Sequence, residues 1–132
     1  MFAGCTSLPS ITIPESVTKI NAYAFSGCDT LPSVAIPNAV TSIESYAFGA
    51  YKTYGNLSKL TNVSLTADSK LTSIGPSAFA NDTNLETMTE PSKLTSIGAM
   101  AFSGCSKFKG FAPLEASVSW NTLAIPNTVS VI

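Results

Sequence analysis

The chain has 132 residues, 45% of them hydrophobic, and its seven basic residues, all Lys, nearly balance eight acidic ones. This length suits one domain with an ordinary core, and without Arg or a basic cluster we do not expect nucleic-acid binding. The chain also lacks His, the commonest general base and metal ligand, which disfavours an enzyme and a metal site. No apolar run is long enough to cross a membrane, and the first residues show no secretory signal.

A repeated unit runs along the chain, and its length is the separation between Phe2 and Phe25. The same Phe returns at Phe48, Phe79 and Phe102, always at this spacing except for the interval from Phe48 to Phe79, which is longer by eight. Insertions near residues 50–56 and 67–69 account for the long interval, and a third is expected near 107–119. We therefore interpret residues 1–132 as a single repeat array, which begins and ends within a unit and is expected to be part of a longer array.

Each unit opens with a short predicted strand. In "LPSITIP", Ile11 and Ile13 alternate with Thr12, and this period of two, rich in β-branched residues, is typical of a strand. Pro14 has no N–H to donate to a ladder, so the strand should end there.

A second β-prone piece, "SVTKI", comes next, followed by Gly or Asn in three of four units. These residues, Asn21, Gly75 and Gly98, tolerate a positive φ and suit a sharp turn, whereas Glu44 breaks the pattern. The stretch "AYAFSGC" that completes the unit is predicted to form a single helical turn.

One unit cannot cover its own apolar residues, so we expect the units to stack. Stacking identical coils about 4.8 Å apart places each Ile on the Ile of the next coil and makes one continuous core. The predicted fold is α/β by classification but mainly β in content: a solenoid of about four or five coils with parallel strand ladders and short helical turns. Thr18, Thr41, Thr72 and Thr95 share one position and predict a ladder of hydroxyls.

The pattern LxxIxIPxxVTxIxxxAFxxC resembles the BspA-like class of leucine-rich repeats of surface proteins. This resemblance implies a leucine-rich-repeat solenoid in an extracellular or cell-surface location, without a cofactor. The implied function is a non-catalytic interaction or adhesion module that binds a protein, including host extracellular matrix, or a glycan. The alternative is a structural spacer that presents other domains. Glu90 departs from the pattern, because it takes the slot of Ile13 and Ile36. It is either a bulged strand residue, which we favour, or a polar break in the core ladder.

The three cysteines, Cys5, Cys28 and Cys105, occupy one repeat position, shortly after the Phe of each unit. Stacked side chains point the same way, which is a poor geometry for a disulfide. We therefore expect buried thiols that behave as small apolar residues, and neither a zinc site nor a catalytic nucleophile.

Candidate partner-binding residues lie in two places. The outward column of the first strand presents small polar side chains, among them Ser10, Thr12, Ser64, Thr87 and Thr89. The insertions add Tyr51, Lys52, Tyr54, Lys107 and Lys109, since loops on a rigid scaffold often carry function and Tyr often anchors interfaces. Phe108, Phe111 and Trp120 have two open interpretations, as core residues of the last unit or as part of a binding loop.

Overall fold

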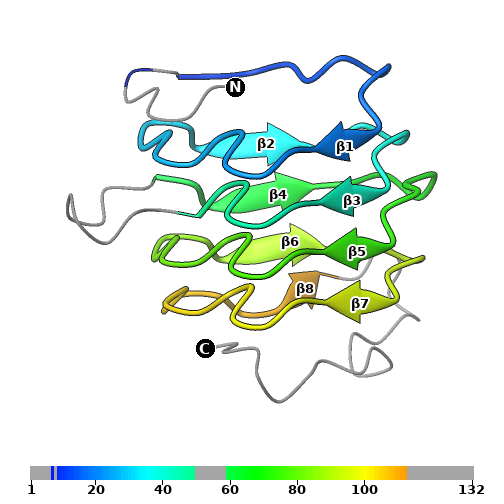
Figure 1. Ribbon diagram of the computed structural model, residues 1–132. Helices are drawn as coiled ribbons and strands as arrows, with labels where there is room; N and C mark the ends of the chain where they lie inside the picture. The colour runs from blue at the N-terminus through cyan, green and yellow to red at the C-terminus, as the bar shows by residue number, and fades with distance from the viewer. Residues whose placement is uncertain (1–6, 8, 50–58, 113–132) are drawn as a thin grey trace.

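The structure, a computed structural model, describes residues 7, 9–49 and 59–112, which form a stack of coils with two parallel ladders (Figure 1). One sheet has the order β1 (Lys19–Ile20), β3 (Ser42–Ile43), β5 (Ser73–Ile74) and β7 (Ser96–Ile97). The other has the order β2 (Ser33–Ala35), β4 (Asn62–Ser64), β6 (Thr87–Thr89) and β8 (Phe111–Ala112). The strands of the two sheets run in opposite directions as the chain goes round each coil (Figure 1). The predicted parallel ladders are confirmed.

The register locates the extra residues of the long repeat. Ser33 pairs with Asn62, which lies six positions beyond one regular period, so the first part of the insertion lies before β4. Ser42 pairs with Ser73, which lies eight positions beyond one regular period, so the remaining two lie between β4 and β5.

A column of stacked Phe rings runs through the core. Successive rings of Phe25, Phe48, Phe79 and Phe102 are 5.1, 5.2 and 5.3 Å apart between centroids and tilted by at most 8°. Burying one such ring contributes about 1.5–3 kcal/mol, and each ring is covered only because a neighbouring coil supplies the next one. The coils are therefore stabilised jointly.

Aliphatic columns from both sheets close the core around these rings. Each column consists of one inward position repeated in successive coils. The last residues of β1, β3, β5 and β7 form one such column: Ile20, Ile43, Ile74 and Ile97. Since both sheets contribute to one core cluster, their outward faces lie on opposite sides of the stack.

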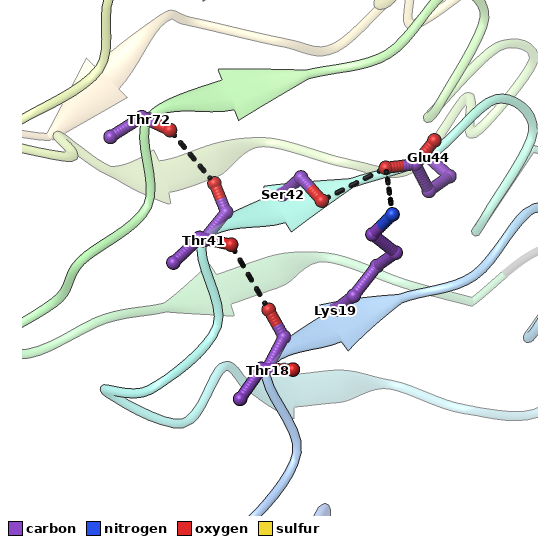
Figure 2. Close-up of polar contacts among 6 residues, drawn as sticks. All are labelled: Thr18, Lys19, Thr41, Ser42, Glu44 and Thr72. Atoms are coloured by element: carbon purple, nitrogen blue, oxygen red, sulfur yellow. Dashed lines mark hydrogen bonds and ion pairs between the residues drawn. The ribbon is translucent and has the colours of Figure 1, made fainter.

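The threonine column forms the predicted ladder beside the first sheet (Figure 2). The hydroxyl of Thr41 donates to the carbonyl of Thr18 at 3.2 Å, that of Thr72 to Thr41 at 3.1 Å, and that of Thr95 to Thr72 at 3.0 Å. These hydroxyls bond to the preceding coil, so their role is structural.

The stretch predicted as a helical turn is not helical in any described coil. The N–H of Ala24 donates to Asn21 at 3.1 Å within its coil, but the next N–H, of Phe25, donates to Ala47 of the following coil at 2.7 Å. Tyr23, with φ of 61°, also interrupts the helical conformation. Alternate N–H groups are thus taken by the neighbouring coil, a competition that propensity within one unit cannot reveal.

The expected positive φ at Gly75 and Gly98 is also wrong, because neither is among the left-handed residues. The left-handed position lies slightly later in each unit, at Tyr23, Tyr46, Ser77 and Met100, with φ of 61, 54, 55 and 60°.

Glycine serves close approach between coils instead. A Cβ on Gly75 would lie 2.8 Å from Ser45 N and 2.9 Å from the carbonyl carbon of Glu44. Without that Cβ, the N–H of Gly75 reaches the carbonyl of Ile43 at 2.6 Å.

Two strand expectations are corrected. Residues 11–13 lie outside any strand in the first described coil, although β2, β4 and β6 contain the residues equivalent to Ile11 and Thr12. Glu90 makes no bulge: Met88 and Glu90 are buried while Thr87 and Thr89 are half-buried, so the alternation continues without an extra residue. A carboxyl therefore occupies a core slot, 6% exposed, and its Oε2 has no hydrogen-bond partner.

The two interpretations of Phe108 and Phe111 are now separated. Phe108 is buried and stacks on Phe102 at 4.5 Å, and Phe111 pairs with Met88 in the ladder. Residues 107–112 thus keep the repeat, and the insertion expected from residue 107 does not begin before residue 113. Trp120 lies outside the described residues.

Replacing Gly75 by Ala should destabilise the fold by about 1–3 kcal/mol, because the added methyl overpacks against backbone of the preceding coil. Urea unfolding measures the change. Glu44→Ala is the matched control, since that position of the repeat already carries a Cβ. Equal stabilities of the two variants would contradict the close-approach role.

Glu90→Leu should stabilise the fold by about 1–3 kcal/mol, because it removes a buried polar atom that has no hydrogen-bond partner. Leu65 fills the same slot one coil earlier, so the substitution matches the column. Glu15→Leu, at an exposed position, should change the unfolding free energy by less than about 0.5 kcal/mol. A loss of stability in Glu90→Leu would show that the carboxyl is satisfied.

Candidate interaction surface

The outward face of the second sheet carries short side chains at the positions between the core residues. Thr12, Ala35 and Ser64 follow one another in successive coils, and Thr12 and Ala35 are exposed. Because strand side chains alternate between faces, the buried Val34 and Ile36 place Ala35 outward. Short side chains on a regular sheet leave the face open.

A cleft of about 360 Å³ lies over this column, at the end of the strands where the chain turns. Its lining includes the apolar Ile13 and Ile36, which we call the floor, and the polar Glu15, Asn38, Ser64 and Thr66, which we call the rim. Among the described residues of the lining, only Glu15 is charged. The cleft can therefore take an apolar group flanked by hydrogen-bonding or basic groups.

Hydrogen bonds between coils hold the polar rim in place. Thr66 donates its hydroxyl to Asn38 Oδ1 at 2.6 Å, and further along the face Thr87 donates to Asn62 Oδ1 at 3.0 Å. Each bond joins neighbouring coils, so the rim is fixed by the same stacking that forms the core.

The lysines at the edge of this face are also tied to the preceding coil. Lys109 Nζ lies 3.6 Å from a carboxylate oxygen of Glu86, and Lys107 donates to Asn84 Oδ1 at 2.9 Å. Both contacts are exposed, and such pairs contribute little to stability. The lysines remain available to a partner at small cost.

The structure brings together only part of the predicted set. Thr12 and Ser64 line the cleft, and Thr87 and Thr89 continue the same face on β6. Ser10 is exposed but does not line the cleft. The loop residues Tyr51, Lys52 and Tyr54 lie outside the described residues.

Sequence reasoning missed two groups. Glu15, Asn38 and Thr66 line the cleft because they sit in the turn after the strand slot, and no motif marked that turn. Tyr23, Tyr46 and Met100 are large exposed apolar residues. Their common repeat position, just before the Ala-Phe dipeptide, was a visible signal.

A second hollow, of about 520 Å³, opens over the first described coil. Core-type side chains line it, among them Ile13, Val17, Ile20 and Phe25. Ile20 and Phe25 are buried, like Ile43 and Phe48 at the equivalent positions of the next coil, so these lining residues belong to the core.

The thiol column gives no sign of a reactive site. Cys28 and Cys105 are buried, and Cys105 Sγ donates to the carbonyl of Phe79 at 3.0 Å. Burial, and secondly the nearby charge of Asp82, raise the pKa of the Cys105 thiol from 9.0 to about 12. The thiolate, which is the nucleophile, is disfavoured there. Cys5 lies outside the described residues.

Within the described ranges, no three His, Cys, Asp or Glu residues gather in a group that could hold a metal ion. A helix with the length and apolar character needed to cross a membrane is likewise not found in that part of the chain.

Comparison with known proteins identifies the repeat. The family model of the BspA type leucine rich repeat region, in six copies, matches residues 1–112. No protein of the curated set matches the chain.

Two solved structures resemble the fold. A leucine rich cell surface protein from Faecalibacterium prausnitzii A2-165 is 25% identical with a TM-score of 0.52, over 90% of this chain and 35% of that one. A leucine-rich repeat protein from Bacteroides ovatus ATCC 8483 is 21% identical with a TM-score of 0.48, over 96% of this chain and 39% of that one. The chain thus spans little more than a third of the length of either protein.

The raised pKa predicts that Cys105 is inert in the folded protein. In a Cys5→Ser/Cys28→Ser variant, a thiol reagent such as DTNB should not react at about pH 8, where the thiolate is scarce, until denaturant is added, and then with one equivalent. Since the folded-state pKa lies above the unfolded value of 9.0, the thiol stabilises the fold below about pH 9. This contribution is lost as the pH rises toward 12. Rapid labelling of the native protein would contradict the assignment.

Proposed function

Because the chain belongs to the BspA-type leucine-rich repeat family, we propose that it is a non-catalytic module that binds a protein ligand through the outward face of its second sheet. Leucine-rich repeats of surface proteins typically mediate protein interactions, and the matched solved structure is a cell surface protein. The proposal places the module outside the cell or on its surface, where host or matrix proteins are the candidate ligands.

The observation that supports this face is the cleft over Thr12, Ala35 and Ser64. Its apolar floor gives a partner side chain a place to bury, and burial of apolar area supplies most of the affinity in such contacts. Glu15 and the hydroxyls on the rim can orient the bound group through directional polar contacts. A ligand that places an aliphatic or basic side chain here fits the chemistry of the lining.

Rigidity is the second argument for this face. The floor residues Ile13 and Ile36 belong to the core, and the rim bonds between coils fix Asn38 and Thr66. A site that is already formed loses little conformational entropy on binding. The described lining of the cleft lacks Trp, Tyr and Arg, the usual anchors, so we expect modest affinity from each contact.

The test is binding of the chain to purified extracellular-matrix proteins and to a glycan array, with Ala35→Arg as the variant that fills the cleft. Ala35 is exposed, so the variant should fold, and it should lower affinity for the protein ligand at least about tenfold, which is about 1.4 kcal/mol. Ser96→Arg, an exposed strand position on the opposite face, is the matched control and should bind normally.

Equal loss in the two variants would contradict this location of the site. Glycan binding without protein binding would show that the ligand is a glycan and not a protein. Binding to neither probe would favour the alternative, a structural spacer.

A further inference from the structure

The second sheet ends at β2, although the chain has one more described coil on that side. β2 is the first strand in the order β2, β4, β6 and β8. Residues 11–13 of the first described coil run past it without forming a strand (Figure 1). The same coil is joined to the next one in the first sheet, where β1 pairs with β3. One edge of β2 therefore has no paired strand within the described residues.

The hydrogen bonds of β2 show which backbone groups face this open edge. The N–H of Ile36 donates to the carbonyl of Ser64, in the following coil, at 2.9 Å. Since the backbone groups of successive strand residues point to opposite edges, those of Ser33 and Ala35 point toward residues 11–13. In the part of the chain that the structure describes, no backbone hydrogen bond joins residues 11–13 to either of them.

The chemistry of the open edge suits an extended peptide. Ser33 and Ala35 each offer one N–H and one carbonyl, at positions about 6.6 Å apart along the strand, and both residues are exposed. An unpaired edge is a template for another strand, and main-chain hydrogen bonds supply the affinity when a peptide is added to a sheet. A sugar ring does not present alternating donors and acceptors at this spacing.

The cleft over the second sheet reaches the same edge. Residues 11–13 and residues 35–38 both line it. On a strand added to β2, the side chain beside Ala35 would point outward as Ala35 does, and therefore toward the cleft. The edge can thus bind the backbone of a peptide while the cleft takes one of its side chains.

We propose that a protein ligand adds an extended segment of its own chain, as a parallel strand, to the open edge of β2. This inference rests on the proposed function, because it names the part of the ligand that this face takes. The added strand stands to β2 as β2 stands to β4. Ala35 pairs with Ser64 in that ladder, so the ligand N–H equivalent to that of Ile36 donates to the carbonyl of Ala35.

Residues 11–13 move outward when this strand is added. Neighbouring strands lie about 4.8 Å apart, so the segment and β2 are then separated by about twice that distance. Among the described residues, the backbone bonds from the first coil to the second begin at Thr18, whose carbonyl accepts from Thr41 at 2.9 Å. None of them holds residues 11–13 in place. Ile13 belongs to the core, and moving it costs part of its burial, so we expect weak binding of short peptides.

The experiment measures amide hydrogen exchange by NMR in the whole isotope-labelled chain, with a synthetic peptide of the sequence of residues 31–38 as the probe. This sequence already pairs with β4 in the register that an added strand would repeat. In the free chain, the N–H of Ala35 should exchange at least about tenfold faster than that of Ile36, which is bonded to Ser64. Millimolar peptide should slow the exchange at Ala35 at least about threefold.

Ser33→Pro removes one donor from the open edge. Pro is tolerated at the first residue of an edge strand, which is the position of Ser33 in β2, so the variant should fold, and circular dichroism checks this. It should weaken peptide binding about tenfold, whereas the control Ser33→Ala keeps the N–H and should bind like the original chain. If Ser33→Pro unfolds, the peptide N-methylated at the residue that corresponds to Ile36 replaces it and should bind the original chain about tenfold more weakly.

Slow exchange at Ala35 in the free chain would overturn the proposal, because another part of the chain would then occupy the edge. Exchange that the peptide leaves unchanged, or equal binding by folded Ser33→Pro and Ser33→Ala, would also overturn it. Slowing that follows the concentration of the chain alone would overturn it in favour of a second copy as the occupant.

Failure of this inference can be told apart from failure of the proposed function. If Ala35→Arg abolishes binding of a matrix protein that Ser33→Pro still binds, the proposed function stands and strand addition is wrong. If the peptide binds to the edge but neither matrix proteins nor glycans bind to the chain, strand addition stands and the ligand of the proposed function is wrong.

Discussion

The bond between one coil and the next is the interaction on which the rest of this structure depends. Within a unit, alternate N–H groups have no acceptor of their own and donate to a neighbour, as Phe25 does to Ala47 at 2.7 Å. The side chains follow the same rule, since each Phe ring is covered by the ring of an adjacent coil. Without a neighbour a coil therefore loses the alternate hydrogen bonds and the cover of its core, and the length of the array is itself a determinant of stability.

That dependence explains which features the sequence could predict. Core columns and register were predictable, because stacking requires the same apolar residue at the same place, and Phe25, Phe48 and Phe79 recur at intervals that insertions explain. The non-helical turn around each Phe was not predictable, because the carbonyl groups that compete for its N–H groups lie in another unit. Gly75 was assigned to a left-handed turn because of its residue type alone. The structure instead requires glycine there because the backbone of the preceding coil approaches too closely for a Cβ. The bulge favoured at Glu90 was wrong, because the alternation of half-buried and buried residues continues through Thr89 to Glu90.

The candidate site shows the same division. Thr12 and Ser64 could be predicted because outward positions follow directly from strand alternation. Asn38 and Thr66 could not, since their place on the rim depends on how turns of adjacent coils meet, and their hydrogen bond joins two different units of the repeat. In a solenoid, therefore, the direction of a strand side chain can be predicted from one unit. A cleft between turns cannot, because two units form it together.

Stacking also constrains what kind of surface such a protein can have. Any outward residue that recurs becomes a row, so a discrete site needs a position at which the row changes. The position before the Ala-Phe dipeptide changes from Tyr46 to Ser77 and then to Met100, and the second sheet becomes hollow where the short side chains of Ala35 and Ser64 follow one another. Both changes leave the inward columns unchanged, because the core is formed by the other, inward-facing positions of each coil. The array can thus alter its outward face one coil at a time while the interactions that hold the coils together stay the same.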